Sequence, residues 1–211
     1  MNKKYIALTF DDGPDPEITP QVLDILKEHG AKGSFFLIGN NITPETEYLV
    51  RREQAEGHEI NTHSLTHSDM TKLTDQQILD EMEETERRIT AIIGQRPKFF
   101  RPPYIAYDER MFRLIDLPFI CGIGCNDWDQ SVSAEERVQK VLADAADGVM
   151  ILLHDQQNNQ KTVEALKVIV PTLIRQGYEL VTLTELFEVY GIAPRSDLPI
   201  IYSDVFKTDL Y

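Results

Sequence analysis

Two histidines four residues apart could share one metal ion. His63 and His67 enclose the segment Ser-Leu-Thr. A helical turn would bring both imidazoles to one face, within reach of a single cation. Two surface histidines without a ligand are the alternative, because a chain with several histidines can contain such a pair by chance. A third ligand would complete a catalytic site, since catalytic zinc commonly has three protein ligands and one open position.

Adjacent carboxylates lie where the first apolar run ends. Asp11 and Asp12 are followed by Gly13 and Pro14. Asp, Gly and Pro are the usual turn formers, so a polar turn is one interpretation. In the other, Asp12 ligates the metal ion while Asp11 stays free as a general base. Because zinc can lower the pKa of bound water to about 7, a carboxylate could accept its proton at neutral pH.

Two more charged residues, Arg101 and His154, end apolar runs of their own. A surface arginine and a buried, hydrogen-bonded histidine are the plain interpretations. If Arg101 lies beside Asp11, its charge favours the ionised carboxylate. A hydrogen bond between His154 and Asp127 would raise the histidine pKa, so that the imidazolium could serve as a general acid.

The elements that must position these residues alternate between short β-rich runs and longer segments of helical period. We predict strands at residues 5–9, 34–37, 59–61, 99–101, 119–121, 149–153 and 179–181. We predict helices that begin at Thr43 with Pro44, at Thr74 with Gln77 and at Ser133 with Glu136, and two more over about 161–177 and 184–190.

Strands that alternate with helices predict a parallel sheet, and about seven such units predict a (β/α) barrel. We expect one domain over residues 1–211, with the aperiodic tail 194–211 packed over the barrel. The carboxyl ends of barrel strands meet at one face, where active sites form. The candidate residues follow predicted strands: Asp11, Asp12, His63, His67, Arg101 and His154.

The amino-acid composition of the chain limits the kinds of molecule that it is expected to bind. The chain has 211 residues, of which 42% are hydrophobic and 27% charged, which is typical of a globular protein. With 21 Lys+Arg against 35 Asp+Glu the net charge is −14, so nucleic acid and anionic lipid are excluded as expected partners. Neutral sugars remain compatible. No run approaches the roughly 18 apolar residues of a membrane span. The composition leaves the oligomeric state open.

The ends of the chain and its cysteines give weaker indications. The apolar run after Lys3 and Lys4 stops at Asp11, too early for a secretory signal. We therefore expect a cytoplasmic protein, or an extracellular one if a leader was removed. Cys121 and Cys125 are four residues apart, which is neither a redox nor a zinc-ribbon spacing, and we expect both to be small buried residues.

Taken in order, the segments TFDDGP, HSLTH, RPPY, NDW and LLH resemble the motifs of the polysaccharide deacetylases of carbohydrate esterase family four, the NodB-homology domain. The match runs from about Ile6 to Val181. The resemblance implies a distorted (β/α) barrel that holds one divalent metal ion and removes acetyl groups from carbohydrate. Zn²⁺ is the expected ion, with Co²⁺, Mn²⁺ or Ni²⁺ as alternatives.

The resemblance also implies a role for each matching residue. The metal ligands correspond to Asp12, His63 and His67. The base and its partner correspond to Asp11 and Arg101, and the acid and its partner to His154 and Asp127. The backbone N–H of Tyr104 matches the oxyanion donor, and the acetyl pocket corresponds to Trp128 and Leu152.

One departure bears on the substrate. The family motif Asp-x-x-Asp-Trp begins here with Gly124, which puts the shape of this loop in question. The segment that ends in NDW resembles the acetylxylan esterases of the family, so O-deacetylation of xylan is the expected activity. An N-deacetylase of chitooligosaccharide or peptidoglycan is one alternative, and a non-catalytic carbohydrate-binding relative is another. A metalloprotease is disfavoured, because Ser64 stands where the HExxH motif has its glutamate.

Overall fold

A mostly parallel sheet lies at the centre of the computed structural model, which describes residues 3–210. Residues 1, 2 and 211, at the ends of the predicted domain, lie outside the described residues. The strand order is β3-β2-β1-β6-β5, and β7 pairs with the start of β1. These strands are β1 (Lys4–Asp11), β2 (Gly33–Leu37), β3 (Glu59–Thr62), β5 (Ile123–Gly124), β6 (Met150–His154) and β7 (Tyr178–Leu180).

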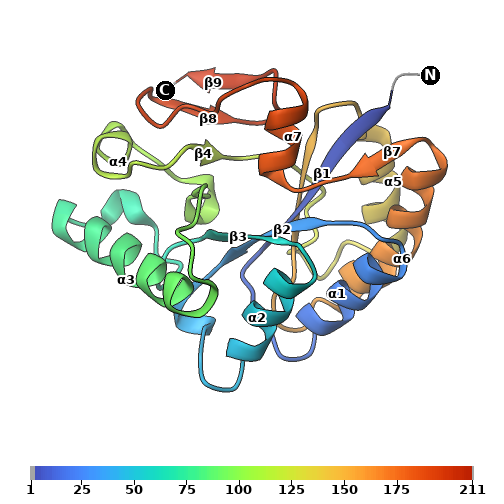
Figure 1. Cartoon of the computed structure of the whole chain (residues 1–211), viewed down its shortest axis with the longest axis horizontal. Coiled ribbons are helices and arrows are strands. Elements are labelled where there is room, and N and C mark those ends of the chain that lie inside the picture. Colours follow the sequence, from blue (N-terminus) through green and yellow to red (C-terminus); the bar gives the residue numbers. More distant parts are fainter. Residues whose placement is uncertain (1–2, 211) are drawn as a thin grey trace.

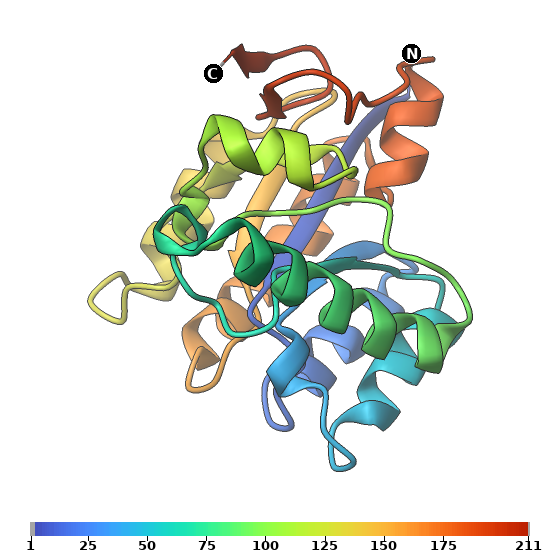
Figure 2. The same cartoon turned by 90° about the vertical axis from the view of Figure 1, so that its left-hand side faces the viewer.

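Helices cover the outside of this sheet (Figure 1). They are α1 (Thr19–Glu28), α2 (Glu47–Ala55), α3 (Asp75–Ile93), α4 (Glu109–Leu114), α5 (Ala134–Asp144), α6 (Gln160–Arg175) and α7 (Leu183–Val189). The long helix α3 crosses the face turned to the viewer in Figure 2. Each helix buries at least one apolar side chain, as expected where helices pack on a sheet.

The first strand organises the site because it pairs on both sides. Its last residue, Asp11, lies beside Phe36 of β2 and beside His154 of β6. The strand is buried from Ile6 to Asp11, which explains its continuous apolar sequence up to the carboxylates. The parallel register therefore brings Asp11 and His154 to the same edge of the sheet, although they are far apart in sequence.

A second set of strands extends the curved sheet. The strands β4 (Phe119–Ile120) and β8 (Ile200–Tyr202) pair in parallel, and β9 (Thr208–Leu210) adds to β8 in the antiparallel direction. Isolated bridges from Phe100 to Thr62 of β3 and to Phe119 of β4 join this set to the central sheet. The predicted single-domain α/β fold with a mostly parallel sheet is confirmed. The predicted strand 99–101 is reduced to the bridge at Phe100, because the two prolines that follow have no N–H for a ladder.

Capping sequences located the starts of two helices, α3 and α5. Both predicted capping boxes, Thr74 with Gln77 and Ser133 with Glu136, are present. The predicted start at Thr43 is wrong by several residues, since α2 begins at Glu47. The Thr46 hydroxyl donates to the carbonyl of Asn41 at 2.5 Å, so the chain makes a separate turn before the helix.

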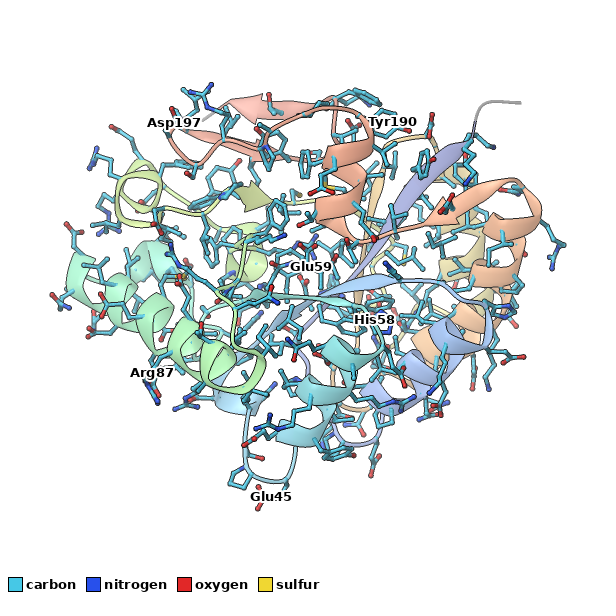
Figure 3. All side chains as sticks on the ribbon, viewed as in Figure 1. Glu45, His58, Glu59, Arg87, Tyr190 and Asp197 are labelled. Carbon is cyan, nitrogen blue, oxygen red and sulfur yellow. The ribbon has the colours of Figure 1, made fainter. Side chains whose placement is uncertain are left out.

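Charged side chains lie mostly at the periphery, as the labelled Glu45, Arg87 and Asp197 show in Figure 3. Among the described residues, no helix combines the length and the apolarity needed to cross a bilayer. Cys125 is buried as predicted, whereas Cys121 is only half-buried. Cys121 lines the pocket described below.

Candidate active site

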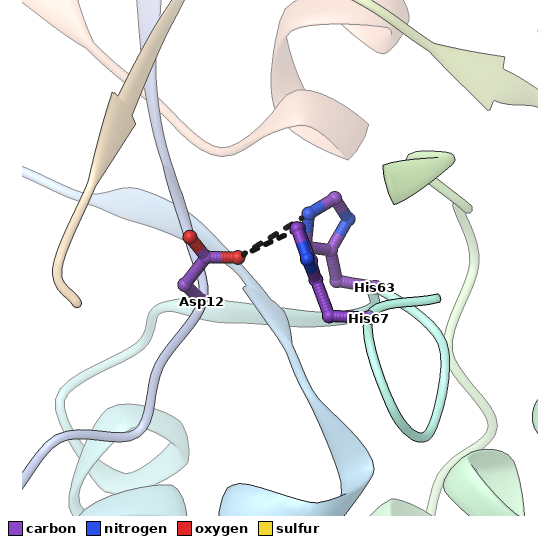
Figure 4. Close-up of side chains that lie close together, drawn as sticks. All are labelled: Asp12, His63 and His67. Carbon is purple, nitrogen blue, oxygen red and sulfur yellow. Dashed lines mark ion pairs between the residues drawn. The ribbon is translucent and has the colours of Figure 1, made fainter. Parts of the chain in front are cut away.

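Three side-chain atoms that could ligate a metal ion, called donor atoms below, converge where the chain leaves β1 and β3. The Nε2 atoms of His63 and His67 lie 3.4 and 3.3 Å from Oδ1 of Asp12 (Figure 4). All three donor atoms lie within 4.8 Å of one another. Oδ1 of Asp12 is buried and accepts no hydrogen bond from the residues that the structure describes, which would be costly without a partner of another kind. Two imidazoles and a carboxylate fit a divalent cation of the zinc type.

The loop that carries the two histidines is not helical. Ser64 and His67 have φ values of 67° and 59°, and Asp12 has a φ of 74°. These left-handed conformations are uncommon for residues other than glycine and often occur at functional sites. The prediction of a helical turn from the four-residue spacing is therefore wrong. The rings meet because an irregular loop turns them toward Asp12.

A hydrogen bond fixes the orientation of the His63 ring. Nδ1 of His63 lies 2.7 Å from the carbonyl of Arg101, which makes this nitrogen the donor and leaves the Nε2 lone pair facing Asp12. The backbone N–H of His67 donates to the Ser64 hydroxyl at 3.1 Å, which holds the backbone of the loop at His67. The His63 tautomer that binds a cation is thus set by a contact within the fold.

Glu81 of α3 anchors the same loop, and sequence reasoning missed it. Its carboxylate accepts from the backbone N–H groups of Leu65 and Thr66, each at 2.8 Å, and from the Thr66 hydroxyl at 2.6 Å. Glu81 is buried on the inner side of α3, between Ile78 and Met82. A glutamate on the apolar stripe of a helix was the available signal, because an acid is rarely buried without a partner.

Replacing Glu81 by alanine is expected to weaken zinc affinity about 10- to 100-fold, because outer contacts that orient metal ligands commonly contribute this much. Glu81→Gln keeps one acceptor oxygen and should recover part of the loss. Competition with a chromogenic chelator measures the affinity directly. Equal affinity in all three proteins would show that Glu81 does not position the loop.

Asp11, next to the Asp12, His63 and His67 cluster, pairs with a buried arginine. Nη1 of Arg101 lies 2.5 Å from Oδ1 of Asp11, and Nη2 donates to the Thr9 hydroxyl at 2.9 Å. Both partners are almost fully buried. Burial by itself would raise the pKa of Asp11, but the Arg101 charge, with smaller contributions from His63 and His154, lowers it. Asp11 is therefore held ionised.

His154 pairs with a buried carboxylate on the other side. Its Nδ1 lies 2.7 Å from Oδ1 of Asp127, and its backbone N–H donates to Oδ2 at 2.8 Å. Burial by itself would lower the pKa of His154. The hydrogen bond and charge of Asp127, together with the charges of Asp11 and Asp12, outweigh burial and raise this pKa to about 9.

A buried network supports Asp127, and it too was missed. Oδ2 of Asp127 accepts from the Thr162 hydroxyl at 2.8 Å. Nη1 of the fully buried Arg137 lies 2.9 Å from that hydroxyl and 2.6 Å from Oδ1 of Asn159. Arg137 occupies a buried position of α5, and a charged residue there was the one available signal.

A pocket of about 590 Å³ joins these groups. Eight of the predicted site residues line it: Asp11, Asp12, His63, His67, Tyr104, Trp128, Leu152 and His154. Arg101 and Asp127 lie behind it, where they contact Asp11 and His154. Tyr104 and Trp128 are 69% and 57% exposed, so both remain open to a ligand. The rings of Tyr104 and His67 form an edge-to-face pair with a centroid distance of 4.5 Å.

Comparison with known proteins agrees with this geometry. The sequence profile described as polysaccharide deacetylase matches residues 1–116, more than half of the chain. The chain belongs to the polysaccharide deacetylase family. A family 4 acetyl xylan esterase from Clostridium thermocellum, solved with a cobalt ion, has the same fold, with a TM-score of 0.93 and 41% identity over 96% of this chain and 99% of that one.

Relatives within the family differ in their substrates. A bifunctional xylanase/deacetylase of Pseudobutyrivibrio xylanivorans is 48% identical over 95% of this chain and 33% of its own length. A peptidoglycan N-acetylglucosamine deacetylase of Listeria monocytogenes is 38% identical over 87% of this chain and 39% of its own length. The chain thus spans well under half of these two relatives.

Proposed function

We propose that this chain is a metal-dependent deacetylase that hydrolyses O-acetyl esters of xylan. The observation that carries the proposal is one pocket that brings the Asp12, His63 and His67 donors together with an ionised carboxylate and a histidine of raised pKa. The similarity to a xylanase/deacetylase and to an acetyl xylan esterase supports xylan as the substrate. We take residues 1–211 as one catalytic domain, with 194–211 packed on it through β8.

Zn²⁺ is the proposed ion, since its preferred ligands are imidazole and carboxylate. Co²⁺, Mn²⁺ and Ni²⁺ are alternatives, and the cobalt in the Clostridium thermocellum structure supports such exchange. When bound, the cation would polarise the acetyl carbonyl and lower the pKa of a water molecule.

The chain's own residues would move the protons. Asp11, kept ionised by Arg101, is the proposed base that takes a proton from the attacking water. His154, kept protonated by Asp127, is the proposed acid that donates to the leaving oxygen or nitrogen of the sugar. The two groups are neighbours across the β1–β6 register, so both can reach a substrate in the pocket.

The remaining residues would hold the acetyl group. The backbone N–H of Tyr104 is the proposed donor to the oxyanion, and this residue has the left-handed φ of 59°. Trp128 and Leu152 are the proposed apolar contacts of the acetyl methyl group. With these assignments, the acetyl carbonyl would lie between the Asp12, His63 and His67 ligand atoms and the backbone N–H of Tyr104.

Acetate release from acetylated xylan and from N-acetylglucosamine oligomers, measured side by side with added zinc, tests the proposal. We expect faster release from xylan. Faster release from the amide substrates would instead favour peptidoglycan or chitooligosaccharide N-deacetylation, which the Listeria relative supports. Sugar binding without turnover under saturating Zn²⁺, Co²⁺ or Mn²⁺ would identify a non-catalytic binding protein.

A further inference from the structure

We propose that the pocket accepts esters of acyl groups longer than acetyl, such as propionyl and butyryl, because its wall is open at Gly124. The inference rests on the proposed esterase function and names the acyl class that the site takes. It depends on position 124, where the pocket wall has a glycine and therefore no side chain.

The strand register points position 124 into the pocket. Gly124 of β5 lies directly beside Leu152 of β6 in a parallel pair. Neighbouring residues in such a pair point to the same face of a sheet, and Leu152 lines the pocket. A side chain at position 124 would therefore occupy pocket space.

That space is open. A Cβ atom built on Gly124 would have Cδ2 of Leu152, at 4.0 Å, as its one non-neighbouring heavy-atom contact within 4 Å in the described structure. Gly124 is also exposed, so the opening leads outward to solvent. The space for one methyl group at this position is therefore free, and we place the end of a longer acyl chain there, beside Leu152.

Gly122, the other glycine in the pocket lining, has no room for a side chain. A Cβ on Gly122 would lie 3.1 Å from the carbonyl oxygen of Met150 and 3.3 Å from Nη2 of Arg101. Gly122 also has a φ of 85°, which strains residues with a side chain. Gly122 therefore serves close packing, whereas nothing in the packing requires a glycine at position 124.

The chemistry of the wall favours a hydrocarbon chain over a sugar branch. The apolar lining residues are Pro102, Ile105, Cys121, Trp128 and Leu152. Methylene groups gain by lying against these side chains, whereas the side chains of Pro102, Ile105 and Leu152 offer a sugar hydroxyl no hydrogen-bond partner.

Xylotriose esterified with acetyl, propionyl or butyryl groups tests the inference, with the released acid measured by chromatography. We expect the wild-type chain to hydrolyse butyryl esters with a kcat/KM within about tenfold of that for acetyl esters, since a methylene that does not fit costs about tenfold or more and the space beside Gly124 takes the added methylenes without a clash. Gly124→Val should lower the butyryl-to-acetyl ratio about tenfold or more, with Gly124→Ala intermediate, because the added methyl groups fill the channel. Ile123→Val, on the same strand but outside the pocket lining, should leave the ratio within about twofold.

An unchanged ratio in both Gly124 variants would overturn the inference, as would a wild-type chain that releases acetate but neither longer acid. Gly124→Ala keeps the test valid if the valine variant folds poorly, since its Cβ meets only an ordinary contact. Failure to release acetate from any acylated carbohydrate would be a different result. It would remove the proposed function, and the acyl inference with it.

Discussion

Replacing His63 by alanine is expected to abolish tight zinc binding and to reduce acetate release by at least about 10³-fold, given the several kcal/mol that a metal ion contributes to transition-state stabilisation. His63 is buried, its Nδ1 contacts the Arg101 carbonyl, and its Nε2 lies 3.4 Å from Oδ1 of Asp12. Removing the ring leaves two donors where a catalytic site needs three. Zinc bound per chain after dialysis and acetate released from acetylated xylan measure the two effects.

His29→Ala is the matched control, because this imidazole lies at the end of α1 and lines a different pocket. It should change neither zinc content nor acetate release. Treating the wild-type chain with a strong chelator should reproduce the His63→Ala result, and added Zn²⁺ or Co²⁺ should restore activity. Full activity of His63→Ala in the presence of chelator would eliminate the metal-dependent mechanism.

The sequence predicts the scaffold well because its signals are local. Continuous apolar runs and capping boxes lie within a few neighbouring residues, so the central strands and the starts of α3 and α5 could be located. The parallel arrangement then implies that residues after strands meet at one edge. Asp11 and His154 follow this rule, since they are register partners in β1 and β6.

Tertiary contacts determine what the sequence could not reveal. The left-handed residues Ser64 and His67 depend on Glu81, which contacts their loop from another element. No local propensity predicts such a loop, and a helical spacing suggested the wrong conformation. Strand β8 is likewise only three residues long and gains its order by pairing with β4.

The contacts that support His154, the proposed acid, were also beyond the reach of sequence analysis. Arg137 reaches Asp127 through Thr162, which lies on a different helix, and through Asn159. Pairs separated by this much sequence can be recognised only when the fold places them together. The chemistry of the reacting residues could therefore be proposed from motifs, whereas the contacts that tune them required the structure.

His154→Gln is expected to slow amide hydrolysis by about 10²- to 10⁴-fold, the range for loss of a general acid. An amine leaving group needs the proton more than an alcohol does, so the loss on acetylated xylan should be smaller. Rates on N-acetylglucosamine oligomers and on acetylated xylan, compared in the same variant, measure the difference. Equal losses on both substrates would contradict the role of His154 as acid.

The pH dependence tests the same assignment through Asp127. Because the pKa of His154 is raised to about 9, the acid is protonated below that pH, and the rate on the amide should fall as pH rises through it. Asp127→Asn removes the charge that raises this pKa, so the alkaline fall should move to lower pH. Asp129→Asn is the control, since its carboxylate accepts from the Ser131 backbone and makes no contact with His154 in the described structure. An alkaline fall at the same pH in both variants would show that the Asp127 charge does not set the protonation of His154.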